Sequence, residues 1–405
     1  MNALGLIVEY NPFHNGHLYH LQQSKAITNS DVTVGVMSGN FLQRGEPAIV
    51  NKWTRTAMAL EAGIDLIIEL PFIHAVQKAE YFAEAAILLL DEVGCKSICF
   101  GSEQGHIDSF IDTYNIIQEN TNEIDHLIQL YNKEGYSYPK AASLAYSEIQ
   151  ARFPTMLSLD QPNNILGFHY VSAILKHNLS IKPETITRTG SGYHDPMLMP
   201  GKIASATGIR KELMENGNLD TVSSFVPSTT LNHLQTYMSE QQLLHHWELY
   251  WPFLKIKLMT TPLESLTEIY EMKEGLENRL IVAAERASSF KEFMNLIKTK
   301  RYTWTRLQRI LTYTLLNFTK SEMPQSLYPP YIRVLGFTHK GQHYLKSIKK
   351  DKGNLLVSRL AACQNPLIEI DKRASFVHAA VLSPSDAAKA QKREYMPPIV
   401  LSHSK

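Results

Sequence analysis

The fold is decided near the N-terminus, where residues 4–17 read LGLIVEYNPFHNGH. The run over residues 4–8 is short and apolar, which predicts a buried β-strand. A helical pattern follows over residues 16–26, so the polar segment between them connects a strand to a helix. A buried strand that leads directly into a helix is the opening unit of a parallel sheet covered by helices.

Strand and helix patterns continue to alternate along the first half of the chain. We predict further strands over residues 32–37, 66–70, 97–100 and 185–189, and helices over residues 52–62, 79–90, 143–152 and 167–176. From residue 241 the patterns are nearly all helical, most clearly over residues 264–284, 290–298 and 304–318, while Pro329, Pro330 and Gly336 indicate turns or a short strand region. The sequence therefore predicts an α/β protein with a Rossmann-like, doubly wound parallel sheet and a mostly helical C-terminal domain.

Charge divides the chain near residue 240. Residues 1–240 carry 15 Lys and Arg against 25 Asp and Glu, a net charge of −10, whereas residues 241–405 carry 25 against 14, a net charge of +11. Such asymmetry suggests an acidic globular half joined to a basic half that meets a polyanion. We therefore expect two domains: an acidic one over residues 1–240, which the motifs described below identify as catalytic, and a basic, mostly helical binding domain over residues 241–405.

The basic residues are concentrated between residues 298 and 350, where 11 Lys and Arg accompany one acid, Glu322. Aromatic residues are interleaved with them: Tyr302, Trp304, Tyr313, Tyr328, Tyr331 and Phe337. Basic side chains suit phosphates and exposed aromatic rings can stack on unpaired bases, so the segment is typical of an RNA-binding surface. The alternative is a solvated basic face over core aromatics.

Several protein classes are excluded. The longest apolar run, around residues 83–90, is too short to span a bilayer, and Glu9 interrupts the apolar start that a signal peptide would need. Cys95, Cys99 and Cys363 lack the spacing of a metal site or a disulfide framework. We expect a cytoplasmic protein with three reduced thiols and no membrane partner.

The strongest local signal is the HNGH string at residues 14–17, which lies between a strand and a helix. The N-terminus of a helix presents free N–H groups and a positive dipole, and Gly16 allows a ligand to approach the backbone closely. Two imidazoles three residues apart can then donate hydrogen bonds to phosphate oxygens. The alternatives are a metal-binding pair, for which no third ligand is evident, and two ordinary surface histidines.

These residues resemble the HxGH nucleotidyltransferase superfamily, whose members attack the α-phosphate of a nucleotide on a Rossmann-like sheet. ASATGIR at residues 204–210 is similar to the ISSTxIR element of that superfamily, which brings a helix N-terminus and an arginine to the β- and γ-phosphates. Ala204 and Ala206 depart from that pattern, whereas Thr207 and Arg210 match it. The resemblance implies catalytic roles for His14, His17, Thr207 and Arg210.

The resemblance narrows to the bacterial tRNA(Met) cytidine acetate ligase family over residues 6–17, 37–41, 63–71, 100–103 and 301–309. That family joins acetate to N4 of the wobble cytidine in elongator tRNA(Met) with ATP. It implies ATP and Mg²⁺ as cofactors, with metal ligands and protein partners unknown. The residues it implies for ATP binding are Ile7, Val8, Glu9, Tyr10, Asn11, Pro12, Phe13, His14, Asn15, Gly16, His17, Leu18, Tyr19, His20, Gly101, Asn164 and Arg188.

Elementary chemistry is consistent with these roles and leaves alternatives for some. Gly101 ends a predicted strand, at the edge where ligands of parallel sheets bind. Asn164 suits a ribose or adenine edge, or a simple turn, and Arg188 suits a phosphate, the acetate carboxylate or a local salt bridge. Lys52 and Arg55 share a helix face that either assists with phosphates or is solvated.

Acetate becomes reactive once it has displaced pyrophosphate from ATP, because AMP can then leave from the acetyl-adenylate. We expect Arg301, Arg306 and Arg309 to bind the tRNA that receives the acetyl group. Two other functions remain open from the sequence. One is a nucleotidyltransferase that makes a dinucleotide-like cofactor from a phosphate ester, and the other is an RNA-binding module without catalysis.

Overall fold

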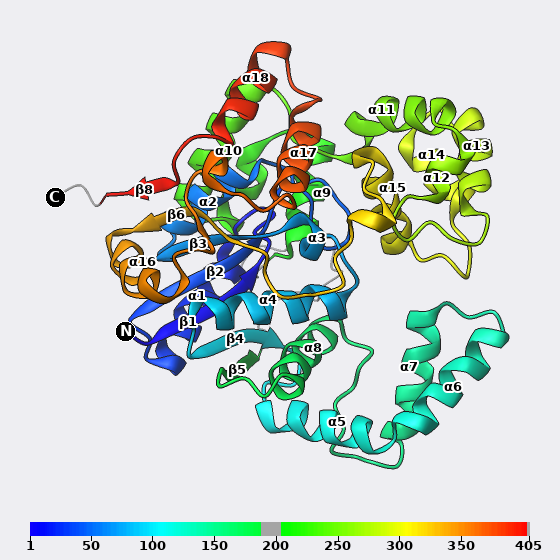
Figure 1. Ribbon diagram of the computed structural model, residues 1–405, viewed down its shortest axis with the longest axis horizontal. Coiled ribbons are helices and arrows are strands. Elements are labelled where there is room, and N and C mark those ends of the chain that lie inside the picture. The colour runs from blue at the N-terminus through cyan, green and yellow to red at the C-terminus, as the bar shows by residue number, and fades with distance from the viewer. Residues whose placement is uncertain (188–203, 403–405) are drawn as a thin grey trace.

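The computed structural model describes residues 1–187 and 204–402. Helices cover both faces of a central sheet, and two further groups of helices extend from it, α11–α15 at the upper right of Figure 1 and α5–α7 along its bottom and lower right. Arg188 and the other residues of 188–203 lie outside the described residues.

Eight strands of the described chain form a single sheet in the order β5-β4-β1-β2-β3-β6-β7, with β8 also paired to β6. Strands β1 to β5 pair with one another in parallel. Their apolar residues are buried by helices on both faces, as expected of parallel strands. The Rossmann-like parallel sheet is therefore confirmed. The strands are β1 (Ala3–Val8), β2 (Val32–Ser38), β3 (Leu66–Leu70), β4 (Ser97–Ser102), β5 (Lys182–Thr187), β6 (Ile332–Thr338), β7 (Leu356–Val357) and β8 (Ile399–Leu401).

The C-terminal half contributes the far edge of this sheet. Strand β6 runs antiparallel to β3, with Arg333 opposite Glu69, and β7 and β8 are parallel to β6. The sequence indicated only turns or a short strand near Gly336, whereas the strand covers seven buried or nearly buried residues. The chain after residue 331 thus returns to the sheet. The sheet therefore contains strands from both sides of residue 240, and the functional division at that residue stays a prediction.

Helices form one layer on each face of the sheet, each around its own core. The first layer comprises α1 (Asn15–Thr28), α2 (Lys52–Glu61), α9 (Ala206–Asn216) and α10 (Ser228–Gln241). The second comprises α4 (Ala79–Val93), α8 (Pro162–Lys176) and α16 (His339–Lys352). The α5–α7 group follows β4 and consists of α5 (Ile107–Glu119), α6 (Thr121–Lys133) and α7 (Tyr138–Gln150).

The α11–α15 group has a core of its own, which it shares with Phe41, Phe72 and Val76 from the loops after β2 and β3. This core fixes the helical group against the carboxyl ends of those strands. The group comprises α11 (Trp247–Thr260), α12 (Leu263–Thr267), α13 (Leu276–Arg286), α14 (Phe290–Ile297) and α15 (Trp304–Leu316), and it packs on α3 (Phe72–Ala75) and α17 (Ile368–Ala379); α18 (Pro384–Arg393) follows α17.

The single helix predicted over residues 264–284 is wrong. The chain leaves α12 after Thr267, and Glu271, Glu274 and Gly275 adopt positive φ angles before α13 begins. A bridge between Ile269 and Thr319 holds this irregular stretch. The apolar residues of the irregular stretch still face the core, so the helical periodicity of the sequence continues across the break. Only Gly275 indicates the break in the sequence.

Candidate active site

His14 and His17 form the N-terminal cap of α1. The ring Nδ1 of His14 accepts a hydrogen bond from the N–H of Gly16 at 3.0 Å, and Nδ1 of His17 accepts one from the N–H of His14 at 3.2 Å. The two rings stack with centroids 3.7 Å apart. Because Nδ1 is the acceptor in both rings, the proton of each neutral imidazole lies on Nε2. Each ring is therefore oriented to donate from Nε2.

The second motif lies beside the first. Ser205 caps α9 by accepting a hydrogen bond from the N–H of Gly208 at 3.0 Å. One turn along, the guanidinium of Arg210 donates to the carbonyl of Asn11 at 3.0 Å and to Oγ1 of Thr207 at 3.3 Å. The tertiary structure thus brings together the starts of two helices that lie about 190 residues apart in sequence.

Both motifs line a single cavity of about 390 Å³. It lies at the carboxyl ends of β1, β4 and β5, the usual position for a ligand of a parallel sheet. Of residues 7–20, all line it except Pro12, Phe13, Asn15 and Leu18. Phe13 is instead a core residue, and the side chain of Asn15 donates to the carbonyl of Ser224.

The remaining residues with an implied ATP role differ in their positions. Gly101 lines the cavity. Asn164 is buried, and its side chain accepts from the N–H of Glu103 at 3.1 Å and donates to the carbonyl of Ser158 at 3.2 Å, so it organises the loop after β4. Its neighbour Asn163 lines the cavity. Arg188 lies outside the described residues.

The sequence analysis missed one wall of the cavity, a tight turn after β2. Leu42, Arg44 and Glu46 all line the cavity. The N–H of Leu42 donates to the carbonyl of Glu46, and Gly45 donates to Leu42, which closes the turn. The only sequence signal was its place after a strand whose carboxyl end faces the ligand edge.

Glu9 ties this turn to the end of β1. Its Oε1 accepts a hydrogen bond from the N–H of Gln43 at 2.8 Å and from the hydroxyl of Ser38 at 3.3 Å. Burial raises the pKa of Glu9, although the Gln43 N–H and the positive charges of Arg44 and Arg55 act in the opposite direction. The carboxylate is therefore a part of the cavity wall with fixed partners.

Lys52 and Arg55 are neither phosphate ligands nor solvated, and both alternatives in the sequence analysis are wrong. Each side chain is completely buried. The guanidinium of Arg55 donates to the carbonyls of Glu9, Ser38 and Gly39, so it fixes the loops after β1 and β2. Arg55 thus has a structural role, whereas the local sequence pattern indicated a charged side chain at the surface.

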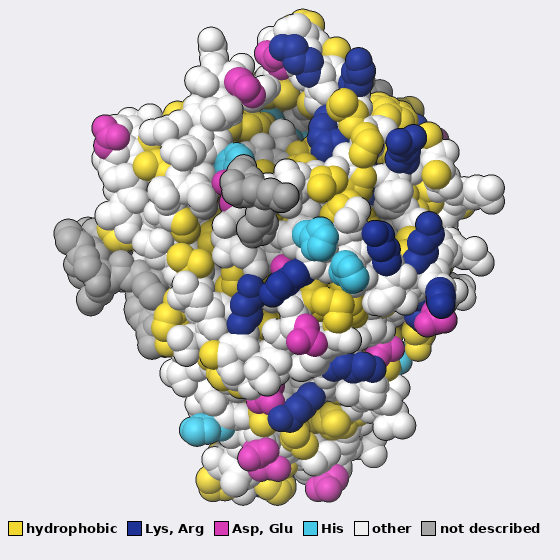
Figure 2. Space-filling view, turned by 90° about the vertical axis from the view of Figure 1, so that its left-hand side faces the viewer, with side chains coloured by type: hydrophobic (Ala, Val, Ile, Leu, Met, Phe, Trp, Pro, Cys, Tyr) yellow, Lys and Arg dark blue, Asp and Glu magenta, His cyan; other side chains and the backbone are white. Residues whose placement is uncertain are grey.

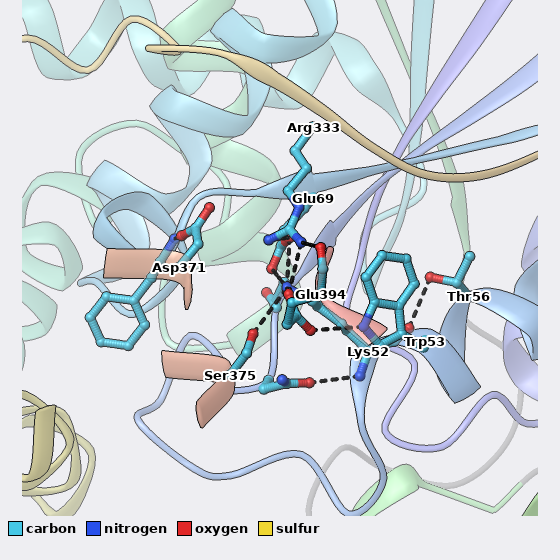
Figure 3. Close-up of polar contacts among 12 residues, drawn as sticks. Lys52, Trp53, Thr56, Glu69, Arg333, Asp371, Ser375 and Glu394 are labelled. Atoms are coloured by element: carbon cyan, nitrogen blue, oxygen red, sulfur yellow. Dashed lines mark hydrogen bonds and ion pairs between the residues drawn. The ribbon is translucent and has the colours of Figure 1, made fainter. Parts of the chain in front are cut away.

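Lys52 belongs to a buried ionic cluster that joins the two halves of the chain (Figure 3). Its ammonium lies 2.8 Å from Glu69 on β3 and 2.9 Å from Glu394 after α18. Arg333 on β6 pairs with the same two carboxylates at 3.1 and 2.7 Å. Burial raises the pKa of Glu394, but the charges of Lys52 and Arg333 outweigh that effect and lower it to about 2.

The predicted RNA-binding arginines occupy different environments. Arg301 is exposed and pairs with Glu274 at 2.9 Å, and Arg306 is half-buried over the ring of Tyr302. Arg309 is buried and pairs with Glu271 at 3.3 Å, so it supports α15 in this structure. Among the interleaved aromatics, Tyr302, Tyr313 and Tyr331 are also buried, and only Tyr328 is clearly exposed. These three rings are core residues, and the prediction that they stack on bases is wrong for them.

The basic segment is also divided in space. Residues 298–309 lie with α14 and α15 on the right of Figure 1, whereas α16, which carries the exposed Lys340, Lys346, Lys349 and Lys350, lies at the opposite edge of the molecule. Figure 2 looks at that left-hand side and shows Lys and Arg side chains running down one half of the face. The basic residues therefore form two surfaces where the sequence suggested one.

Two features are absent from the described ranges, 1–187 and 204–402. No group of three or more His, Cys, Asp or Glu residues there could hold a metal ion. No helix among them is long and apolar enough to cross a membrane. The three cysteines are free thiols, and burial raises the pKa of Cys99 to about 11.

Comparisons with known proteins agree with this geometry. A family model described as HIGH Nucleotidyl Transferase matches residues 1–394. The tRNA(Met) cytidine acetate ligases of Geobacillus sp. (strain WCH70) and Bacillus subtilis (strain 168) are 46% and 45% identical to this chain, over 99% and 98% of it and over 100% and 96% of their own lengths.

Solved structures give the same result. Thermotoga maritima TmcAL in its apo form matches with a TM-score of 0.91 at 32% identity, covering 99% of this chain and 100% of that chain. The form bound with alpha-thio ATP matches with a TM-score of 0.88 at 31% identity over the same shares. The similarity thus extends over the sheet and both helical groups.

Proposed function

The chain belongs to the HIGH nucleotidyl transferase family and, within it, to the tRNA(Met) cytidine acetate ligases, and from this membership we propose that it joins acetate to N4 of the wobble cytidine of elongator tRNA(Met) at the expense of ATP. The observation that carries the proposal is the convergence of His14, His17, Thr207 and Arg210 on one cavity. The crystal structure of the Thermotoga maritima relative with alpha-thio ATP supports ATP as the co-substrate.

The first half-reaction is the formation of acetyl-adenylate. A carboxylate oxygen of acetate attacks the α-phosphorus of ATP, the bond to the bridging oxygen of pyrophosphate breaks, and pyrophosphate leaves. We propose that the Nε2–H groups of His14 and His17, whose Nδ1 atoms accept backbone hydrogen bonds, act with the N-terminus of α1 to stabilise negative charge on the α-phosphoryl oxygens. These donors gain strength as the charge builds up in the transition state.

Arg210 and the N-terminus of α9 are the proposed site for the β- and γ-phosphates. The capped helix start offers backbone N–H groups, and the guanidinium can bind two phosphate oxygens at once. Its hydrogen bond to the carbonyl of Asn11 ties this site to the loop that precedes His14. The two phosphate sites therefore hold the leaving group in a fixed position relative to the α-phosphate.

Mg²⁺ is proposed as the counter-ion of ATP. The described residues offer no cluster of three or more metal-binding side chains, so they do not fit a metal held by the protein alone. A Mg²⁺ ion that is bound chiefly by phosphate oxygens and water needs few protein ligands. We therefore assign no step of the reaction to it.

In the second half-reaction N4 of the cytosine attacks the acyl carbon, the bond to the AMP oxygen breaks, AMP leaves with the electron pair, and N4 loses a proton. A base in an anticodon loop can be presented unstacked at lower cost than a base in a duplex. We propose that Arg301, Arg306 and Arg309 mark the side of the protein where the tRNA binds. The proposed location is the cytoplasm, where ATP and tRNA occur together.

The proposal is tested by the requirements of the exchange of radioactive pyrophosphate into ATP. We expect exchange that needs acetate and does not need tRNA, and mass spectrometry of nucleosides from treated tRNA should then show N4-acetylcytidine. Exchange that requires a phosphate ester would indicate a cofactor-forming nucleotidyltransferase. The absence of any exchange would indicate a module without catalysis, and acetylation from acetyl-CoA without ATP would overturn the mechanism.

A further inference from the structure

The turn over residues 42–46 connects the catalytic cavity to the helix that carries Arg306. On one side its Gln43 N–H is bound to Glu9 at the end of β1. On the other side Oγ1 of Thr312 on α15 donates to the carbonyl of Gly45 at 2.7 Å. Gly45 packs so closely on α15 that a Cβ atom there would lie 2.5 Å from the backbone nitrogen of Arg309. The turn is therefore held rigidly between the two proposed substrate sites.

Arg44 and Glu46 both face the cavity from this turn. The carboxylate of Glu46 lies 3.7 Å from the guanidinium of Arg210, which belongs to the proposed phosphate site. About a third of the Glu46 side-chain surface, 33%, is exposed. In the second half-reaction pyrophosphate has left, so the space beside Arg210 is open to a base whose N4 must come to about 3–3.5 Å from the acyl carbon. The turn borders this space and contacts α15, so a base of RNA bound near α15 would meet it.

The chemistry of the two side chains matches the edge of cytosine, which adenine shares in its amino donor and adjacent ring acceptor but not at O2. Cytosine presents an amino donor at N4 and acceptors at N3 and O2. A carboxylate only accepts hydrogen bonds, and a guanidinium only donates them. Uracil and guanine present an acceptor where cytosine has its amino group and an N–H donor next to it, so they would oppose both side chains.

We propose that Arg44 and Glu46 recognise the target cytosine, a role that rests on the proposed function. Glu46 accepts a hydrogen bond from the N4 amino group, and Arg44 donates hydrogen bonds to N3 and O2. The pair distinguishes cytosine from uracil and guanine and directs N4 at the acyl carbon. The turn that carries them is fixed by α15, so the position of the base is set by the same helix that presents Arg306.

The test combines Arg44→Ala with the replacement of N3 of the target base by a C–H group. Full-length wild-type and variant proteins acetylate two synthetic anticodon stem-loops, one with cytidine and one with 3-deazacytidine at the target position. We expect each single change to lower the transfer rate by about 10-fold or more, as for a hydrogen bond to a charged group. We expect the double change to cost little beyond Arg44→Ala alone, because that variant has already lost the N3 contact that 3-deazacytidine removes.

Three further measurements distinguish failure of the recognition role from failure of the proposed function. Gln43→Ala is the matched control, because the Gln43 side chain lies on the same turn and donates to the carbonyl of Gln77 outside the cavity. It should leave the transfer rate near that of the wild type. In Arg44→Ala the Michaelis constant for acetate in pyrophosphate exchange should change by less than about threefold. The stem-loop affinity should also change little, because phosphate contacts dominate it.

Each other outcome has a defined meaning. Additive losses from Arg44→Ala and 3-deazacytidine would overturn the recognition role. An increase of tenfold or more in the Michaelis constant for acetate would show that Arg44 binds the carboxylate, and an equal loss in Gln43→Ala would show that only the shape of the turn matters. If the wild type itself lacks acetate-dependent exchange, the proposed function fails and not merely this inference.

Discussion

His14 and His17 show how single residues combine a structural and a chemical role. Their Nδ1 atoms accept backbone N–H groups and complete the cap of α1, which fixes the rings and the tautomer at once. Serine, the usual cap, could accept the same hydrogen bond but offers no second nitrogen. The cap therefore positions the donors that we propose for the phosphoryl transfer.

Replacement of His17 tests the chemical role apart from the cap. In His17→Asn the side-chain oxygen can still accept from the N–H of His14, but the imidazole donor is lost. We expect the rate of acetate-dependent pyrophosphate exchange to fall by about 10² or more, with a much smaller change in the affinity for ATP. Thermal unfolding should stay near that of the wild type. Turnover near the wild-type rate would remove His17 from the phosphate site.

Among the elements, helix α15 has a buried face in the core and a proposed RNA-binding arginine in its first turn. Its buried face holds Leu307, Ile310 and Leu311 in the core of the helical group and contacts Gly45. Its first turn, capped by Thr303, presents Arg306 beside Tyr302. The arginines of this helix are thus unequal, because Arg309 is buried with Glu271 whereas Arg306 is partly accessible.

We expect Arg306→Ala to weaken tRNA binding and to reduce the slope of log affinity against log salt by roughly 0.7–0.9, as for one lost phosphate contact. Acetate-dependent exchange without tRNA should be retained, because α15 lies outside the residues that line the cavity. Lys389→Ala, which removes one charge from α18, is the control and should change the slope less. Equal loss of exchange and of binding would mean that Arg306 supports the fold.

At the scale of the whole molecule, the buried ionic cluster fastens the C-terminal segment to the sheet. Lys52 and Glu69 come from the first half of the chain, and Arg333 and Glu394 come from the second. Asp371 on α17 lies nearby, where it accepts hydrogen bonds from the N–H of Phe72 and the hydroxyl of Tyr331. Loss of one partner in such a cluster leaves a buried charge, which typically costs about 3–5 kcal/mol.

Asp371 should make the stability depend on pH. Burial and the charge of Glu69 raise its pKa from 3.8 to about 7, so the folded protein binds a proton that the unfolded chain releases above pH 4. Its contribution to stability is therefore complete below about pH 4 and is lost as the pH rises to about 7. Asp371→Asn removes the titration, so Tm of the variant relative to the wild type should be higher at pH 8 than at pH 5.

Differential scanning calorimetry at the two pH values measures this difference. Other titrating groups occur in both proteins and cancel in the comparison, provided that the substitution preserves the fold. Retained acetate-dependent exchange in Asp371→Asn would confirm an intact cavity. A Tm difference that is the same at pH 5 and pH 8 would show that Asp371 does not change its protonation in this range.

The sequence by itself determined the parts that depend on local patterns. Strand β3 was predicted to the residue, and β1, β2, β4, α1, α2 and α4 were predicted within a few residues, because each is a short segment with its own periodicity and caps. The HNGH string at residues 14–17 could also be identified locally, since a helix start with a glycine and donor side chains occupies a few consecutive residues. The element at residues 204–210 was identified by its resemblance to the superfamily.

Only the tertiary structure decided what depends on partners far along the chain. Lys52 and Arg55 are buried because Glu69, Glu394 and distant carbonyls surround them. The turn with Arg44 and Glu46 faces the cavity because Gly45 packs on α15. Burial is a property of the folded whole, and no local pattern of charge or hydropathy records which distant segment will cover a residue.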